Sequence, residues 1–176
     1  MSAFAFFWGV AEGSVFFLLP DTLLTATALG SFRKALRQCL WALVGALVAG
    51  FFLHAHARRD PTAARNLVLK VPFVRPTMID AVDAVYARRG AAAVLMGPLR
   101  GIPYKIYAVR APVQGIGLGA FLLVSVPARL ARFVAMAALA AGVSRLLGSS
   151  RRRAAWALWA GLWAVGYGLY WAGVAS

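Results

Sequence analysis

Two long apolar stretches constrain this chain more than any other feature of its sequence. Residues 38–57 and 154–175 are each long enough to cross a bilayer core of about 30 Å as an α-helix, which takes about 20 residues. A third stretch, residues 116–142, carries only two charges, Arg129 and Arg132. Charged residues make up 14% of the chain, against about 25% in a typical soluble domain. The sequence therefore predicts an all-α integral membrane protein with these three transmembrane helices.

Two further apolar segments are interrupted by proline, so neither is a convincing span. Residues 3–30 are broken at Pro20, where two short helices are expected to meet, and residues 91–114 are broken at Pro103. A span follows each broken segment, and this repetition is typical of inverted repeats with re-entrant elements. Because irregular backbone at membrane depth must be satisfied by protein or water, we expect the two tips to face each other around a polar site.

The remaining segments complete a single membrane domain over residues 1–176. Residues 58–76 form a polar connection. Residues 77–89 are predicted to form an amphipathic helix at the membrane interface, with Thr77 and Asp80 in a capping-box pattern. A small-xxx-small spacing in the last span, Ala157–Gly161, indicates helix contact or self-association into a homo-oligomer.

The strong positive charge points to anionic lipid as the partner. The chain has 19 Lys and Arg residues against 5 Asp and Glu, a formal net charge of +14. These cations alternate with membrane segments, which favours lipid headgroups over nucleic acid. Basic residues load both faces of the predicted topology equally, so the positive-inside rule gives no orientation.

Five cations lie within the apolar segments, where only two acidic residues, Glu12 and Asp21, accompany them. An uncompensated cation at the bilayer centre costs about 2.5–3.5 kcal/mol. The excess therefore predicts a cationic cavity that binds the phosphate of a lipid, since arginine and lysine both suit phosphate oxygens. The predicted binding residues are Arg100, Lys105, Arg110, Arg129 and Arg132.

Two alternatives stay open for these charges. Arg129 and Arg132 can instead reach toward the interface and pair with headgroups nonspecifically. Glu12 and Asp21 can form salt bridges with arginines, or they can carry protons, because burial moves carboxyl groups toward a titratable range.

The sequence offers little for catalysis. Cys39 is the single cysteine, and His54 and His56 lie together at the end of one span. Phosphohistidine chemistry needs a histidine placed with acid support, and metal-dependent chemistry needs clustered carboxylates. We therefore expect no enzyme, no metal and no cofactor. A lipid-phosphate enzyme and a non-catalytic scaffold or assembly factor are the rival hypotheses.

Two stretches resemble a known family. "AEGSVFFLLPDTLLTATAL" is similar to the first re-entrant motif of the DedA/VTT-domain (SNARE-associated Golgi protein) family. "GIPYKIYAVRAPVQGIGLGAFLLVSVPARLARF" resembles the second motif, most closely in the YqaA-like branch. The resemblance covers about residues 5–140. The residues that it singles out are Glu12, Pro20, Asp21, Arg100, Pro103, Lys105, Phe121, Arg129 and Arg132.

The resemblance implies a lipid transporter, flippase or scramblase in the bacterial inner membrane. Bacterial members are implicated in recycling undecaprenyl phosphate and in proton-dependent envelope maintenance, and other members move phospholipids. This chain departs from the family pattern at two places. Many members have arginine where this chain has Lys105, and an Ala-Gly turn where it has Ala111–Pro112. These departures leave the identity of the lipid open.

Overall fold

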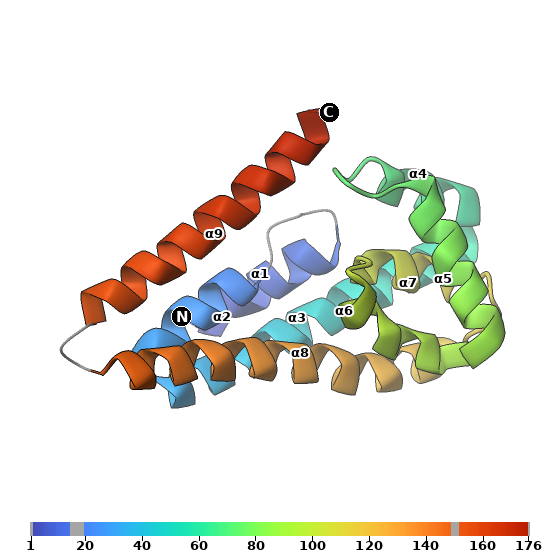
Figure 1. Ribbon diagram of the computed structural model, residues 1–176. Helices are drawn as coiled ribbons and strands as arrows, with labels where there is room; N and C mark the ends of the chain where they lie inside the picture. Colours follow the sequence, from blue (N-terminus) through green and yellow to red (C-terminus); the bar gives the residue numbers. More distant parts are fainter. Residues whose placement is uncertain (1, 15–19, 149–151, 176) are drawn as a thin grey trace.

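The computed structural model describes residues 2–14, 20–148 and 152–175, and every regular element in these ranges is a helix. The long helices α3 and α8 run side by side, α4 and α5 gather at one end, and α9 extends away from the rest (Figure 1). In chain order the elements are α1 (Ser2–Gly13), α2 (Asp21–Gly30), α3 (Phe32–Arg59), α4 (Pro61–Leu69), α5 (Pro76–Arg89), the 3-10 helix η1 (Gly90–Met96), α6 (Gly97–Arg100), α7 (Tyr104–Arg110), α8 (Leu118–Leu147) and α9 (Arg152–Ala175).

Helix α3 contains the predicted span 38–57, and α8 contains most of the predicted span 116–142. Among the described residues, they are the two helices long and apolar enough to cross a membrane by length and composition. Helix α3 is longer than the predicted 38–57 because Ser31 caps its start, accepting a hydrogen bond from the Lys34 backbone N–H. Helix α8 continues past residue 142 to Gly148, whose φ of +72° ends it.

Helix α9 covers the predicted span 154–175 but differs from α3 and α8 in composition and packing. Tryptophan, tyrosine and glycine alternate with its alanines and leucines. Its described side chains are mostly exposed, and it packs on α2 and α8. The indole N–H groups of Trp159 and Trp163 both donate to Thr25 Oγ1, at 2.9 and 3.2 Å, and Tyr167 bonds Thr22. These bonds fasten one face of α9 to α2.

Both proline-broken segments form short helices separated by a break. In the first segment, α1 ends at Gly13 and α2 begins at Asp21, directly after Pro20; residues 15–19 between them lie outside the described ranges. In the second segment, Gly101 has a φ of +66°, a left-handed conformation that favours glycine, and Pro103 precedes α7. In the second segment the helix therefore breaks close to the predicted position.

The region predicted as a polar connection, residues 58–76, contains a helix. Asp60 caps α4 by accepting a hydrogen bond from the Ala63 N–H at 2.8 Å, and Pro61 occupies the first helical position. Helix α5 also starts differently from the prediction, because Pro76 begins it and Arg75 occupies the cap without a side-chain bond. Pro76, and not the predicted Thr77 cap, therefore marks the start of α5, because the fixed φ of proline suits the first helical position.

Helix α5 buries one face against α7 and η1. Ile79, Val82 and Val85 belong to a core that also includes residues of α4, α7 and α8. The buried Tyr86 hydroxyl donates to the Tyr107 backbone oxygen at 2.9 Å. Burial raises the pKa of Tyr86 well above its ordinary value, so the phenol stays protonated and keeps donating.

Glycines bring α1 and α3 into backbone contact. A β-carbon added at Gly9 would collide with the Ala42 backbone oxygen, and one added at Gly45 would collide with the Phe6 backbone oxygen. Each helix therefore contributes one glycine that lets the other approach. This contact fixes α1, and with it Glu12, against the long helix α3.

Candidate functional site

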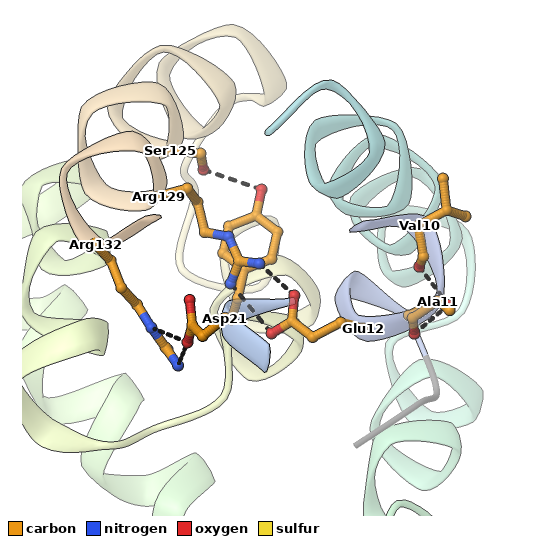
Figure 2. Close-up of polar contacts among 9 residues, drawn as sticks. Val10, Ala11, Glu12, Asp21, Ser125, Arg129 and Arg132 are labelled. Carbon is orange, nitrogen blue, oxygen red and sulfur yellow. Dashed lines mark hydrogen bonds and ion pairs between the residues drawn. The ribbon is translucent and has the colours of Figure 1, made fainter. Parts of the chain in front are cut away.

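A buried ion pair joins α1 to α8. Arg129 of α8 donates through both terminal nitrogens to the two carboxylate oxygens of Glu12 at the end of α1 (Figure 2). The side chains are 4% and 8% exposed. A bidentate arginine–carboxylate pair is the geometry in which two buried charges satisfy each other best.

A second ion pair lies one helical turn further along α8. Arg132 donates to Asp21 Oδ2 from Nε at 3.2 Å and from Nη2 at 2.6 Å. Asp21 is the first residue of α2 and its side chain is 2% exposed, whereas that of Arg132 is 28% exposed. The spacing of three residues places both arginines on one side of α8, as predicted. Figure 2 shows them reaching toward the two acids of the first broken segment.

Aromatic rings enclose the buried arginine. The Arg129 guanidinium carbon lies 4.9 Å from the ring centre of Tyr104 and 4.8 Å from that of Phe133. These contacts are close enough for cation–π attraction. Tyr104 also donates to Ser125 Oγ at 3.1 Å and stacks on Phe121, with ring centres 5.5 Å apart. The first residue of α7 is thus held against α8 directly beside the ion pair.

The turn before α8 is fixed by a buried histidine of α3. His54 Nε2 forms a hydrogen bond with the Ile116 backbone oxygen at 3.0 Å, and the His54 ring stacks on Phe121 at 5.7 Å. Sequence analysis predicted no role for His54 beyond a position at the end of a span. In the structure it connects α3 to the turn that starts α8, and it stacks on Phe121, which also stacks on Tyr104.

Lys105 lies in a cavity between the two broken segments. The residue is 3% exposed and follows the Pro103 break in α7. The cavity has a volume of about 460 Å³, and its wall includes Lys105, Glu12 and Arg132. Residues from both broken segments and from α8 therefore share one charged space.

The charges around this cavity do not cancel. The site brings together three of the predicted cations and both predicted carboxylates. Counted together, Lys105, Arg129 and Arg132 against Glu12 and Asp21 carry a formal net charge of +1. Within the described ranges, the buried atoms Asp21 Oδ1 and Arg129 Nε have no hydrogen-bond partner in the protein. The site thus keeps a net positive charge together with unused donor and acceptor capacity.

The structure does not bring the other two predicted binding residues into the cavity. Arg100, the last residue of α6, is exposed. Arg110, the last residue of α7, donates to both carboxylate oxygens of Asp83 in α5, at 2.8 and 2.6 Å. Asp83 was missed because the partners for Arg110 were sought only within the apolar segments. The sequence signal that could have identified Asp83 was its position four residues after Ile79, beside the buried face of α5.

Breaking the Arg110–Asp83 ion pair should have only a small effect on stability. Replacing Asp83 by asparagine should lower the free energy of unfolding by about 1 kcal/mol or less, because both side chains keep access to water, at 15% and 26% exposure. Thermal unfolding of the purified protein in neutral detergent measures this difference. A loss above about 3 kcal/mol would show that the pair is as critical as a fully buried one.

Metal chemistry has no visible site in the described part of the chain. Among residues 2–14, 20–148 and 152–175, no group of three or more His, Cys, Asp or Glu side chains is arranged to hold a metal ion. The polar groups of the site are instead guanidinium, ammonium and carboxylate. Such a set binds anions through charge and hydrogen bonds.

Comparison with known proteins identifies no relative of this chain. No protein-family model, no curated protein and no solved structure matches this chain. The likeness to the DedA/VTT-domain family therefore stays a prediction based on the quoted motifs, and the function is argued from the site itself.

Proposed function

We propose that this chain is an integral membrane protein that moves an anionic lipid between leaflets, as a transporter, flippase or scramblase. The lipid phosphate binds in the cavity beside Lys105. In this proposal α3, α8 and α9 span the bilayer, and the two proline-broken segments are re-entrant from opposite faces. The length and apolarity of α3 and α8 support the insertion. The undecaprenyl phosphate carrier and phospholipids are the candidate lipids, and the bacterial inner membrane is the proposed location.

The observation that carries the proposal is a cavity whose neighbouring charged side chains sum to a net positive charge. Its volume is about 460 Å³, its wall includes the buried Lys105 with Glu12 and Arg132, and the five charged residues of the site carry a formal charge of +1. A buried net charge is unfavourable unless a counter-charge or water compensates it. A phosphate headgroup supplies that counter-charge.

The ion pairs define separate roles for the charged residues. Glu12 and Asp21 are both engaged by arginines, which favours the role of salt-bridge partners over that of proton carriers. Arg129 is enclosed by rings and by Glu12, so in this proposal it shapes the site. Lys105 and the partly exposed Arg132 are the cations that contact the phosphate.

Transfer of a headgroup-labelled anionic lipid in proteoliposomes tests this function. Lys105→Gln should reduce the transfer rate at least about tenfold, because a buried charge–phosphate contact is worth more than about 1.4 kcal/mol. Lys105→Arg should keep most of the rate, since the positive charge remains. Lys70→Gln is the matched control: it removes the same charge at an exposed position and should leave transfer unchanged.

The same assay separates the rival hypotheses. If folded Lys105→Gln protein moves lipid as fast as the original chain, the proposed binding site is wrong. A scaffold predicts no transfer by any variant, including the unmodified protein. Release of inorganic phosphate from the lipid during the assay would instead support a lipid-phosphate enzyme.

A further inference from the structure

A second, apolar space lies next to the charged cavity. A groove of about 350 Å³ runs between α8 and α9, with α2 at its edge. Its wall is almost entirely hydrocarbon, and among the described residues that line it Thr25 is the one with a hydroxyl group. From α8 it includes Leu139, Ala140 and Val143, and from α9 it includes Leu158 and Leu162. A groove of this size and composition suits an extended hydrocarbon group.

The groove and the charged cavity share part of their wall. Trp163 and Gly166, on consecutive turns of α9, line both spaces. The cavity holds Lys105 and Arg132 on the other side of this shared wall. A molecule with an anionic end in the cavity therefore has an apolar space next to it, across a wall that includes Trp163 and Gly166.

Hydrogen bonding keeps the polar atoms of the groove occupied. The indole N–H groups of Trp159 and Trp163 both donate to Thr25 Oγ1, and the Thr25 hydroxyl donates to the Asp21 backbone oxygen at 2.6 Å. The three side chains thus satisfy one another. A hydrocarbon chain in the groove would leave none of these donors unpaired.

We infer that the groove between α8 and α9 holds the hydrocarbon chain of the same lipid whose phosphate binds beside Lys105. The inference rests on the proposed function and extends it: the ligand is one amphiphile bound at two adjoining subsites. Positive charge on one side of the shared wall and bare hydrocarbon on the other match the two ends of such a molecule. Helix α9, with few contacts to the rest of the protein (Figure 1), forms the outer wall of both subsites.

Two glycines of α9 provide a matched test. A β-carbon at Gly166 or at Gly161 meets no atom within 4 Å, so a side chain can start at both places. Gly166→Phe adds a ring to the wall that the two subsites share, whereas Gly161→Phe adds the same ring to an exposed position that lines neither space. The probes are hexadecyl phosphate, which has a long chain, and butyl phosphate, which fits in the cavity alone. Calorimetric titration of the purified full chain in neutral detergent gives their affinities.

The unmodified protein should bind hexadecyl phosphate at least about tenfold more tightly than butyl phosphate. Gly166→Phe should reduce the preference for hexadecyl phosphate over butyl phosphate about tenfold, while Gly161→Phe should leave that preference unchanged. Equal affinities of the two probes, or equal effects of the two substitutions, would overturn the chain subsite and leave the proposed phosphate site intact. Failure of both probes to bind the unmodified protein would overturn the phosphate site and the chain subsite together.

Discussion

Replacing Glu12 by glutamine should lower the free energy of unfolding by about 3–5 kcal/mol, the largest effect expected for any single charged residue in this protein. Glutamine keeps the shape of the side chain but removes its charge. The Arg129 guanidinium would then stay buried, enclosed by Tyr104 and Phe133, without its counter-charge. Lys105 lines the same cavity as Glu12. In the variant, the remaining charges of the site would therefore all be positive except that of Asp21. Denaturant unfolding in neutral detergent, followed by tryptophan fluorescence, measures the loss.

A second substitution identifies the cause of this loss. The double variant Glu12→Gln with Arg129→Met removes both charges of the pair, and replacing a buried pair by apolar groups is often neutral or stabilising. It should therefore recover most of the stability lost in the single variant. Asp83→Asn, which breaks the more exposed pair, serves as the matched comparison with its smaller loss. If Glu12→Gln costs no more than Asp83→Asn, burial of the Arg129 charge is not what makes this pair important.

Replacing Gly45 by alanine should destabilise the protein even though alanine favours helices by about 1 kcal/mol over glycine. The added methyl group would collide with the Phe6 backbone oxygen and would lie 2.9 Å from the Val10 backbone nitrogen. Backbone atoms of a packed helix cannot move aside as a flexible side chain can, so α1 must shift. Overpacking of this kind costs about 1–3 kcal/mol. A collision with backbone atoms lies at the upper end of that cost, so after the gain in helix propensity the net loss in unfolding free energy should be about 1–2 kcal/mol.

Gly142→Ala in α8 is the control for Gly45→Ala. A β-carbon at Gly142 meets no atom within 4 Å, so only the gain in helix propensity remains, about 1 kcal/mol at most. The two variants should thus change the free energy of unfolding in opposite directions. A shift of α1 also moves Glu12, so Gly45→Ala should weaken lipid transfer, whereas Gly142→Ala should leave it unchanged. Equal stability of the two variants would mean that the α1–α3 contact is not close enough to exclude a methyl group.

The prediction of an all-helical chain is confirmed for the described residues, with α3 and α8 containing most of the two spans predicted at 38–57 and 116–142. The prediction of a polar connection at 58–76 was incomplete, because it did not include helix α4, which the Asp60–Pro61 cap starts. Local signals of this kind are readable from sequence when they are sought. Insertion into a membrane, re-entrant topology and lipid transport remain predictions.

The sequence did not determine which charged residues pair. It identified Glu12 and Asp21 as candidate partners for cations, but not which cation each carboxylate would contact. Arg129 and Glu12 are 117 positions apart, and no periodicity connects them. The surplus of three charges predicted in the apolar segments fell to one around the cavity, because Asp83 neutralises Arg110 and Arg100 lies at the surface.

By itself, the sequence determined the helical character of the chain, the two proline-broken segments and the presence of more cations than acids among apolar residues. These properties follow from local rules, since helix periodicity, proline geometry and composition act over a few residues. The tertiary structure decided that α1, α2 and α7 meet one face of α8, that two arginines are paired, and that Lys105 lines a cavity that shares wall residues with an apolar groove. Those facts depend on distances between remote segments, which side-chain packing and the glycine contacts of α1 with α3 set.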